Sequence, residues 1–479
     1  MRTRHISLVP VPPPLAAGVE RLRDELDVPH EFPPEVREVA RRSAADGPAT
    51  RPGRRDLTDL DLVTIDPPGS MDLDQAVCVQ RSRHGYRVWY AIADVAAWVA
   101  PGDAVDREAH RRGQTFYAPD SRSPLHPPVL GEGAASLLAD GHDRPALVWR
   151  IDLDSSGQVT GSTVERARVR SRGRLSYQHV QRELDAGTAR DSLRLLREVG
   201  LLRERVEAER GGVSLNLPEQ EVRGEDGTWV AEFRRPLPVE GWNAQISLLT
   251  GMAAAGMMLA GGVGVLRTLP PAHPADRVHL RHVAKSLHIP WAAGTPYPEF
   301  VRSLDPDVPE HLAMLTACTT LFRGAGYTLI GPGTDPDAVR HAALAADYAH
   351  ATAPLRRLVD RYVGEVCVAL CAGAEVPEWA LAALPKLPAE MAESDQRAHR
   401  FERGVLDLVE ALELSGRVGD TFTGVVVEVE AGGRRGLVTV AQPAVEAPVS
   451  GSDLPLGEEI AVRLARCDTD TGRIAFAQA

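Results

Sequence analysis

The stretch LVTIDPPGSMDLDQAVCV, residues 62–79, decides the architecture that we expect for this chain. Its two apolar ends are rich in β-branched residues and predict strands, while the Pro-Pro-Gly-Ser insert between them predicts a tight loop. Asp66, Asp72 and Asp74 therefore lie at strand ends around one point. In an extended backbone, Asp72 and Asp74 face one side and their apolar neighbours face the other.

Three carboxylates in one turn repel one another and require a compensating cation. Clustered oxygen ligands without Cys or His suit a hard ion such as magnesium or manganese. The alternative is a solvated acidic turn, since Asp and Gly are ordinary loop residues. The spacing alone leaves both interpretations open.

Length and composition set the outer bounds. A chain of 479 residues predicts more than one domain, on a prior of roughly 100–200 residues per domain. Its apolar content of 43% and charged content of 25% are typical of a globular protein with an ample core. The formal net charge of −12 argues against indiscriminate nucleic-acid binding, although a local basic channel is compatible with an acidic total.

The five cysteines are scattered, and none belongs to a C-x-x-C pair. This pattern argues against a zinc site or a disulfide framework and favours free thiols in a reducing cytoplasm. Prolines break the apolar run in residues 1–14 before it could serve as a signal peptide. The most apolar window, 248–265, is rich in glycine and small residues and predicts a buried helix and a loop. We therefore expect a cytoplasmic protein that does not contact a membrane.

Hydrophobic periodicity divides the chain into four parts. Residues 1–50 predict a short leader with helices at 17–26 and 34–42, and residues 56–170 are rich in strand patterns. From residue 176 the pattern becomes helical, and after Gly419 strands return between Gly-rich turns, which suggests a small closed barrel of the OB type. The predicted segments are strands 86–92 and 146–151, helix 103–112, helices 188–210, 240–260, 308–323, 353–371 and 388–414, and strands 421–429, 436–440 and 459–463.

A second charged group lies far downstream, in YAHATAPLRRLVDRY at 348–362. Pro354 suits the first turn of a helix, whose amides attract anions, and Arg356 and Arg357 then lie in that turn. Their guanidinium groups match phosphate oxygens. The alternative is that both arginines pair with Asp360 and other acids on a helix surface. Acids and arginines form one reaction centre only if the fold brings them together, which spacing does not show.

Several motifs, taken in order, resemble the ribonuclease II (RNB) family of 3′→5′ exoribonucleases over roughly residues 56–414. They are TID at 64–66, DLDQA at 72–76, AIADV at 91–95, RGQTFY at 112–117, RLSY at 174–177 and the stretch from Thr352 to Arg357. The resemblance implies a mixed β-sheet core wrapped by helices, a narrow channel for single-stranded RNA and a C-terminal RNA-binding OB barrel. The implied barrel agrees with the small closed barrel that the strand patterns predict for residues 419–479.

The resemblance also implies roles for individual residues. Asp66, Asp72 and Asp74 match aspartates that serve magnesium and the attacking water, and Arg356 matches an arginine that contacts the scissile phosphate. Tyr177 matches a tyrosine that holds the 3′-terminal nucleotide, although a lone tyrosine before a helix is more often a packing residue. The implied chemistry is metal-assisted in-line hydrolysis that yields 5′-mononucleotides.

The chain departs from the family pattern at three places. Gln75 stands where the family usually has a fourth aspartate, and its neutral oxygen can ligate a metal but cannot neutralise it. Ala353 replaces a serine. Gln245 and Ile246 align loosely with the acids that sense the ribose, so we assign no sugar-recognition residue. The leader is also too short for two cold-shock barrels.

We therefore expect an α+β fold with a mixed β-sheet catalytic core wrapped by helices and a C-terminal OB-fold β-barrel. The expected division is a leader at 1–50, a catalytic domain at 51–414 and an RNA-binding domain at 415–479.

The expected function is a metal-dependent hydrolytic 3′→5′ exoribonuclease acting on single-stranded RNA. An RNA-binding protein of the same fold, with catalysis weakened or lost because of Gln75, is the alternative. The assigned residues are Asp74 and Arg356 for catalysis, Asp66, Asp72, Asp74 and Gln75 for Mg²⁺ or Mn²⁺, and Tyr177, Arg356 and Arg357 for RNA. We expect a monomer. We also expect no nucleotide cofactor, because the glycines at 261–264 lack the context of a dinucleotide site.

Overall fold

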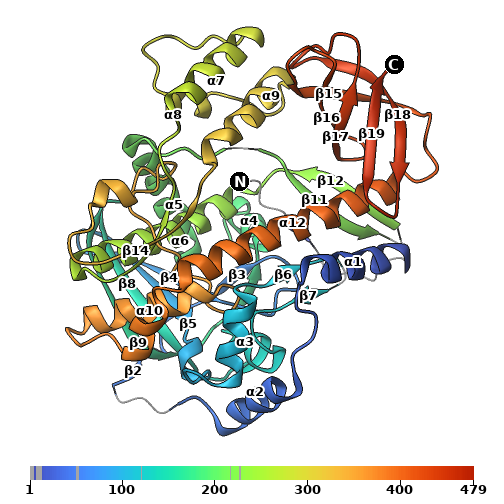
Figure 1. The fold of residues 1–479 in the computed structure, drawn as a ribbon. Helices are drawn as coiled ribbons and strands as arrows, with labels where there is room; N and C mark the ends of the chain where they lie inside the picture. Colours follow the sequence, from blue (N-terminus) through green and yellow to red (C-terminus); the bar gives the residue numbers. More distant parts are fainter. Residues whose placement is uncertain (1–4, 7–12, 50–52, 120, 216, 226–227) are drawn as a thin grey trace.

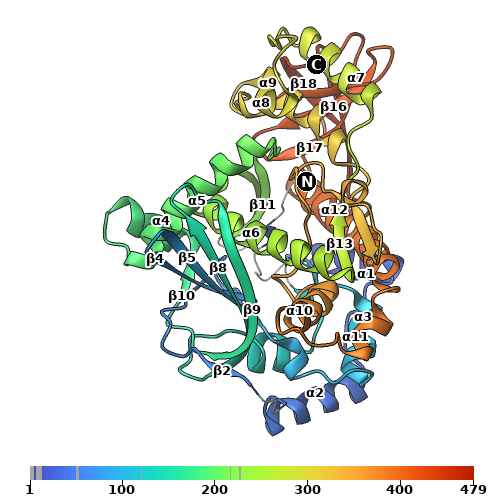
Figure 2. The ribbon, with the colours of Figure 1, turned by 90° about the vertical axis from the view of Figure 1, so that its left-hand side faces the viewer.

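A five-stranded sheet lies at the centre of the computed structural model (Figures 1 and 2). The structure describes residues 5–6, 13–49, 53–119, 121–215, 217–225 and 228–479, so most of the apolar run at the N-terminus lies outside the described residues. Four strands of the sheet form an antiparallel meander, and a short fifth strand joins one edge in parallel. In spatial order the strands are β2 (Arg55–Asp56), β9 (Val159–Val169), β8 (Arg144–Asp154), β5 (Gly85–Ala93) and β4 (Gln75–Ser82).

Both faces of this sheet are buried, as the middle strand β5 shows. Val88, Tyr90 and Ile92 enter one hydrophobic cluster, while Trp89 and Ala91 enter another on the opposite face. Alternate residues of a strand point to opposite faces, so a strand that is apolar at almost every position requires cover on both sides. The first face packs on α5 (Asp191–Arg210), α6 (Pro238–Gly261) and α10 (Leu358–Cys371), and the second on α2 (Pro34–Asp46) and α3 (Ala104–Arg112).

Short strands surround the central sheet and tie distant segments together. Strand β3 (Thr64–Asp66) pairs in parallel with β10 (Arg174–Ser176), and this register places Asp66 opposite Ser176. The other small sheets are β6 (Phe116–Tyr117) with β7 (Arg122–Ser123), β13 (Gly264–Thr268) with β14 (Gly326–Ile330), and β1 (His5–Ile6) with β11 (Glu219–Glu225) and β12 (Thr228–Arg234).

The remaining helices flank this core and extend toward the C-terminus. They are α1 (Pro13–Leu26), α4 (Tyr177–Asp185), α7 (Pro274–Ser286), α8 (Tyr297–Arg302), α9 (Pro309–Cys318), α11 (Glu378–Ala383) and α12 (Leu387–Glu413), with short helical turns at 95–97, 129–134, 319–322 and 336–339.

A closed five-stranded barrel forms the C-terminal region, at one end of the molecule (Figure 1). Helix α12 runs from the core to this barrel, and its Ala411 lies in the barrel's own hydrophobic cluster together with Leu414. The neighbouring strands, in order around the barrel, are β15 (Thr421–Val429), β16 (Arg435–Val440), β17 (Val445–Ser450), β19 (Arg473–Gln478) and β18 (Glu459–Asp468).

The mixed sheet wrapped by helices and the C-terminal barrel confirm the predicted fold class. The long elements agree closely with the sequence patterns, since strand β15 has its predicted bounds and α12 differs from its prediction by one residue at each end. The patterns missed β9, β17 and β19. The predicted helix at 353–371 begins instead at Leu358, for a reason that lies in the site below. The predicted division into a leader and two domains stays a prediction.

Helix α6 contains the most apolar window of the chain. Among the described residues it is the one helix long and apolar enough to cross a membrane by length and composition, a test that core helices also pass. Its buried residues include Trp242, Ile246, Leu249 and Met258, which lie in the same cluster as the central sheet. This packing agrees with the predicted buried helix.

Candidate active site

The acid-rich turn connects two neighbouring strands. Val63, just before β3, and Val77 of β4 exchange two backbone hydrogen bonds of 2.8 and 3.1 Å, which brings the two ends of the turn together. The buried Ser136 holds the loop between them, because its Oγ accepts from Leu73 N (3.0 Å) and donates to Met71 O (2.6 Å). Leu73 is fully buried and fixes the backbone between Asp72 and Asp74.

Asp74 is the deepest acid of the turn and meets the arginine motif directly. The backbone N–H of Leu355 donates to Oδ1 over 2.7 Å, and Arg356 Nε lies 3.3 Å from Oδ2. The Asp74 side chain is 4% exposed and that of Arg356 is 51% exposed. Burial raises the pKa of Asp74 well above its ordinary value, against the opposing effect of Arg356. The fold therefore joins the two predicted catalytic residues, and the guanidinium still faces solvent.

The loop that carries Arg356 is not helical, which corrects the prediction that Pro354 starts a helix. Both Arg356 N and Arg357 N donate to Ala353 O, and Arg357 has an extended backbone with φ −145°. The loop is tied instead to the segment 113–115, because Thr115 N donates to Arg356 O (3.0 Å) and Leu358 N donates to Gly113 O (2.9 Å). These cross-connections replace the hydrogen bonds of a first helical turn.

Arg357 points to a different partner from Arg356. Its guanidinium makes two hydrogen bonds to Asp360, of 2.5 and 2.8 Å, and Asp360 also accepts from Ala353 N over 2.8 Å. This is the pairing that the sequence left as the alternative for both arginines, and the structure shows it for Arg357 alone. With its fork filled by a carboxylate, Arg357 braces the loop, and its assignment to RNA stays a prediction.

Asp72 lies at the edge of the turn and contacts a residue that the sequence did not single out. Arg122 Nη1 is 3.0 Å from Asp72 Oδ1, and Arg122 Nη2 is 2.8 Å from Glu132. Arg122 comes from β7, the second strand of a hairpin whose first strand, β6, is the end of the RGQTFY motif. The motif hinted at this neighbourhood through Tyr117, whose pKa burial raises strongly, with Asp72 and Asp74 adding to the effect.

Asp66, at the end of β3, is the least compensated acid. Its Oδ2 is buried and has no hydrogen-bond partner. Burial raises the pKa of Asp66 to about 7, with a further contribution from the charge of Asp72, while Arg356 and Arg174 oppose the rise. A buried oxygen without a donor is costly in a folded protein, so Asp66 is the acid of this turn that the protein's own side chains compensate least.

Gln75 does not present its oxygen freely. The hydroxyl of Tyr90, on the neighbouring strand β5, donates a short hydrogen bond to Gln75 Oε1. Burial raises the pKa of Tyr90 well above its ordinary value, and the nearby Tyr177 and Asp66 add to the rise, so the hydroxyl stays protonated beside the acids. The sequence analysis treated Tyr90 only as part of a strand. A metal at Gln75 would compete with this hydrogen bond, and the assignment of Gln75 to the metal stays a prediction.

Tyr177 reaches the site through the β3–β10 pairing. Ser176 caps helix α4 by accepting from His179 N (3.2 Å), and Tyr177 is the first residue of the helix. Its hydroxyl accepts a hydrogen bond of 3.4 Å from Asn243 of α6. Burial raises the pKa of Tyr177 to about 12, with Asp66 as the next contribution, which places the ring beside the acid turn. The structure thus gathers Asp66, Asp72, Asp74, Arg356 and Tyr177 around one point.

These side chains fit a hard cation by their chemistry. Among the described residues, no three His, Cys, Asp or Glu side chains are arranged to hold a metal by themselves. The donor set nevertheless consists of oxygens, and the orphaned Asp66 Oδ2 lies within it. Asp66 and Asp72 are therefore the residues that would hold a divalent ion, with Asp74 beside them. Gln75 fits less well, because Tyr90 binds its oxygen.

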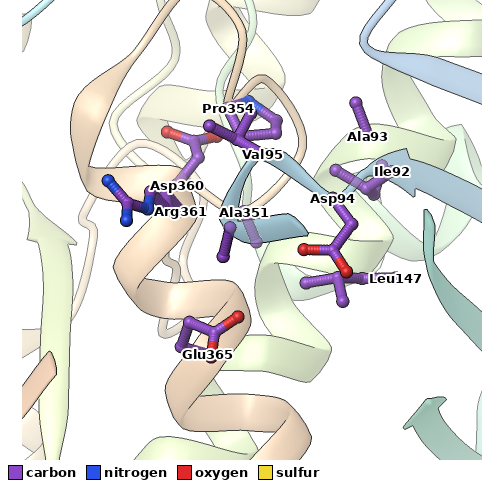
Figure 3. Close-up of a pocket in the computed structure, with 11 residues that line it drawn as sticks. Ile92, Ala93, Asp94, Val95, Leu147, Ala351, Pro354, Asp360, Arg361 and Glu365 are labelled. Atoms are coloured by element: carbon purple, nitrogen blue, oxygen red, sulfur yellow. The ribbon is translucent and has the colours of Figure 1, made fainter. Parts of the chain in front are cut away.

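Beneath the arginine loop lies a second polar cluster, around a cavity of about 10 Å³ (Figure 3). Asp94, at the end of β5, and Glu365, on α10, line this space together with Asp360 and Leu147. Arg361 turns its guanidinium toward Asp106, at 2.5 Å. The cavity has room for about one water molecule, so this cluster is a structural support for the loop.

Comparison with known proteins places these features in a family pattern. Residues 54–371 match the family model described as RNB domain, and residues 420–479 match the model of the RNase II-type exonuclease C-terminal S1 domain. Ribonuclease R of Aquifex aeolicus (strain VF5) is 25% identical over 469 residues, which covers 88% of this chain and 64% of that protein. The chain spans 35%, 64% and 52% of the length of three curated relatives, all named ribonuclease R.

Two solved structures share the fold. Mycoplasma genitalium RNase R in complex with ribose methylated single-stranded RNA has a TM-score of 0.86 at 19% identity, covering 98% of this chain and 78% of that chain. Yeast Ssd1, described as a pseudonuclease, has a TM-score of 0.70 at 18% identity, covering 89% of this chain and 54% of that chain. At these identities the likeness shows the fold alone, and the chemistry has to be argued from the residues of this chain.

Proposed function

The chain belongs to the RNB family, and from this premise we propose that it removes nucleotides by hydrolysis from the 3′ end of single-stranded RNA. One observation carries the proposal. The buried carboxylate of Asp74 contacts both the Leu355 amide and the Arg356 guanidinium. Leu355 is 281 residues away from Asp74 in the sequence. Acids that gather around a half-exposed arginine suit a reaction in which a phosphate enters between them.

In the proposed reaction, a water oxygen attacks the terminal phosphodiester and the bond from phosphorus to the O3′ of the preceding nucleotide breaks. The products are a 5′-mononucleotide and an RNA shortened by one residue. Arg356 would bind the phosphate and balance the negative charge that grows on its oxygens, since its side chain is half exposed and already oriented by Asp74. Tyr177 would hold the 3′-terminal nucleotide.

A divalent cation completes this proposal, with magnesium as the first choice and manganese as the second. When bound, such an ion would supply an activated water and charge stabilisation. Asp66 and Asp72 would hold it, and Asp74 would stay in its hydrogen bond to Leu355 N, which orients the carboxylate relative to Arg356. The five cysteines are all unpaired, which supports the cytoplasm as the proposed compartment.

The test is a time course on a single-stranded oligoribonucleotide labelled at its 5′ end, with and without EDTA. We expect a ladder that shortens from the 3′ end, release of 5′-mononucleotides, and no shortening in EDTA. A 3′-end label should leave as a mononucleotide at the first step. Cleavage inside the chain, or undiminished cleavage in chelator, would contradict the proposal.

A second candidate function is RNA binding without turnover. The hydrogen bond from Tyr90 to Gln75 favours it, because it engages the side chain that stands where the resemblance to the family implies a fourth acid. The similar fold of a protein described as a pseudonuclease shows that this architecture occurs without catalysis. The same time course separates the two functions: stable binding of the labelled RNA without any shortening at saturating Mg²⁺ or Mn²⁺ would establish the second.

A further inference from the structure

A second pocket lies far from the acid turn, between helix α7 and the segment that leads into α8. Its volume is about 280 Å³, and it is lined by Arg277, Arg281, Trp291, Tyr297 and the residues 293–296. Both arginines are exposed. The pocket is polar on the α7 side and aromatic on the other, a combination that suits an anionic ligand better than an apolar one.

Helix α7 presents a line of positive charge. Arg277, Arg281 and Lys285 follow one another at intervals of four residues, which places them on one face of the helix. All three are exposed, and among the described residues no carboxylate lies within ion-pair distance of any of them. Asp276 is the one acid within the helix. In a chain whose net charge is −12, three adjacent cations without acidic partners stand out.

The middle cation of this line is held in place. The Arg281 guanidinium lies 4.3 Å from the centre of the Trp291 ring. Phe300 stacks on the same indole, with 4.0 Å between the ring centres and an angle of 1° between the planes. Trp291 Nε1 donates to Thr295 O over 3.0 Å, which fixes the indole. Arg281 Nη1 also donates a long hydrogen bond of 3.5 Å to Trp291 O. A cation–π contact orients a guanidinium without using its N–H groups, so the remaining N–H groups are available to a ligand at a low entropic cost.

The unit that carries this line is packed against the C-terminal barrel. Leu280 of α7 and Leu287, the residue that follows α7, share a hydrophobic cluster with Val427 of β15. Gly457 in the barrel lies so close to Leu287 that an added Cβ would be 2.2 Å from its side chain. Figure 1 shows α7 and α8 beside the barrel, at the end of the molecule away from the five-stranded sheet.

We propose that Arg277, Arg281 and Lys285 form a contact surface for the phosphate backbone of single-stranded RNA. The line spans about 12 Å, from roughly 1.5 Å of rise per helical residue, and so can contact more than one phosphate. It would bind the part of a long substrate that remains outside the acid site. This inference rests on the proposed function for its ligand, and it concerns affinity for RNA, not the hydrolytic step.

The experiment measures RNA binding to the full chain in EDTA, where hydrolysis is not expected to interfere. The probe is a 5′-fluorescein single-stranded oligoribonucleotide of about 20 nucleotides, followed by fluorescence anisotropy over a series of KCl concentrations. In the variant Arg277→Gln/Arg281→Gln we expect about tenfold weaker binding at low salt. The slope of log affinity against log salt should fall by about 1.4, since the variant loses two cations and each phosphate contact to a single strand contributes about 0.7.

The matched control is Arg197→Gln/Arg205→Gln on α5. These two arginines are also exposed, and Arg197 also lies over a tryptophan, at 5.7 Å from the Trp242 ring. The control makes the same change in net charge, and we expect binding within twofold of the wild type. Equal losses in the two variants, or no loss in either, would overturn the proposal, because the effect would then be one of total charge or absent.

Hydrolysis of a short substrate separates this inference from the proposed function. An oligoribonucleotide of about four nucleotides is too short to occupy both places, so its turnover in the Arg277→Gln/Arg281→Gln variant should equal that of the wild type. If the wild type binds RNA through α7 but degrades none, the proposed function fails and the surface stands. A variant that degrades the short substrate normally and binds long RNA as tightly as the wild type refutes the surface and leaves the proposed function intact.

Discussion

Two groups of buried acids lie near the arginine loop 351–357, and they are compensated very differently. In the supporting cluster, Asp94 pairs with Arg54 at 2.7 Å and with Arg166 at 3.0 Å, and Arg166 also binds both oxygens of Glu365 at 2.6 Å. In the acid turn, Asp74 has one arginine at 3.3 Å whose side chain is half exposed. Each group keeps one buried oxygen without a hydrogen-bond partner, Asp66 Oδ2 in the acid turn and Asp94 Oδ1 in the supporting cluster, so the difference lies in the arginines.

The difference shows that this fold pairs buried acids with arginines in the supporting cluster but gives the acid turn fewer such partners. A buried carboxylate without a cation destabilises the folded protein. It therefore either becomes neutral, because burial raises its pKa, or is balanced by a bound cation. The raised pKa values of Asp66 and Asp74 are the first outcome, and the binding of a cation would be the second. The supporting cluster is built for stability, and the acid turn is built to receive a charged ligand.

The largest expected effect comes from removing a charge in the acid turn. Asp74→Asn keeps the size of the side chain and an oxygen for the Leu355 amide, but it loses the charge that orients Arg356. We expect turnover to fall by roughly 10³-fold, equivalent to about 4 kcal/mol, while RNA affinity stays within a few-fold because many contacts hold the strand. Single-turnover hydrolysis and anisotropy, measured on one preparation, check both. Turnover within tenfold of the wild type would remove Asp74 from the mechanism.

Loss of an arginine from the supporting cluster should lower the free energy of unfolding. Arg166→Gln leaves Asp94 and Glu365 buried with one cation fewer, and breaking a buried pair costs about 3–5 kcal/mol. Urea unfolding should show this loss, while turnover per folded molecule stays near that of the wild type at low temperature.

The control for that comparison is Arg168→Gln on the same strand. Arg168 pairs with Asp56, and both side chains are more than half exposed. A surface pair of this kind contributes about 0–1 kcal/mol. If the two variants lose the same stability, the contrast between the clusters is wrong.

Gln75 tests whether the acid turn lacks one charge. Gln75→Asp adds a carboxylate while keeping the Tyr90 hydroxyl as a donor, so we expect a half-saturating metal concentration about tenfold lower and higher activity at low Mg²⁺, since hard ions are held largely by charge. Mn²⁺ binding by calorimetry gives a readout apart from activity. Unchanged or poorer metal use with slower turnover would show that another carboxylate already occupies the position. Tyr90→Phe, which frees the Gln75 oxygen, should give a smaller change in the same direction.

Glu410 provides the smallest test, outside the acid turn. It is buried on α12, its Oε1 accepts from Gln220 Nε2 at 2.6 Å, and burial raises the pKa of Glu410 to about 8. The folded protein therefore keeps a proton that the unfolded chain loses above pH 4.5. The stabilisation is complete below that pH and is lost as the pH rises to 8, with a slope of at most about 1.4 kcal/mol per pH unit.

Glu410→Gln should flatten this part of the stability curve, because the amide needs no proton to stay neutral. Chemical unfolding between pH 5 and 9 measures the difference from the wild type. Glu393→Gln is the control on the same helix, because that side chain is 74% exposed. A wild-type curve that is parallel to that of Glu410→Gln would show that the buried acid is compensated after all.

Local patterns in the sequence were sufficient for most of the architecture. A short apolar run predicted β5, strand patterning between Gly-rich turns predicted β15, and the three-and-four spacing predicted α5, α6 and α12, because these patterns report which faces of an element are buried. The chemical character of the acid turn left two interpretations open, a metal site and a solvated acidic loop, and the resemblance to the family favoured the first. The motif order then connected Arg356 and Tyr177 to those acids.

What the sequence by itself determined is therefore the presence and type of the reactive groups: the acids at 66–74, the arginines at 356–357, and the fold class that surrounds them. Only the tertiary structure decided their partners. It placed Arg356 on Asp74, gave Arg357 to Asp360, moved the helix start to Leu358, and set the Tyr90 hydroxyl on Gln75. The physical reason is that burial follows from local periodicity, whereas a hydrogen bond or ion pair depends on which distant segments the packed core brings within about 3 Å of each other.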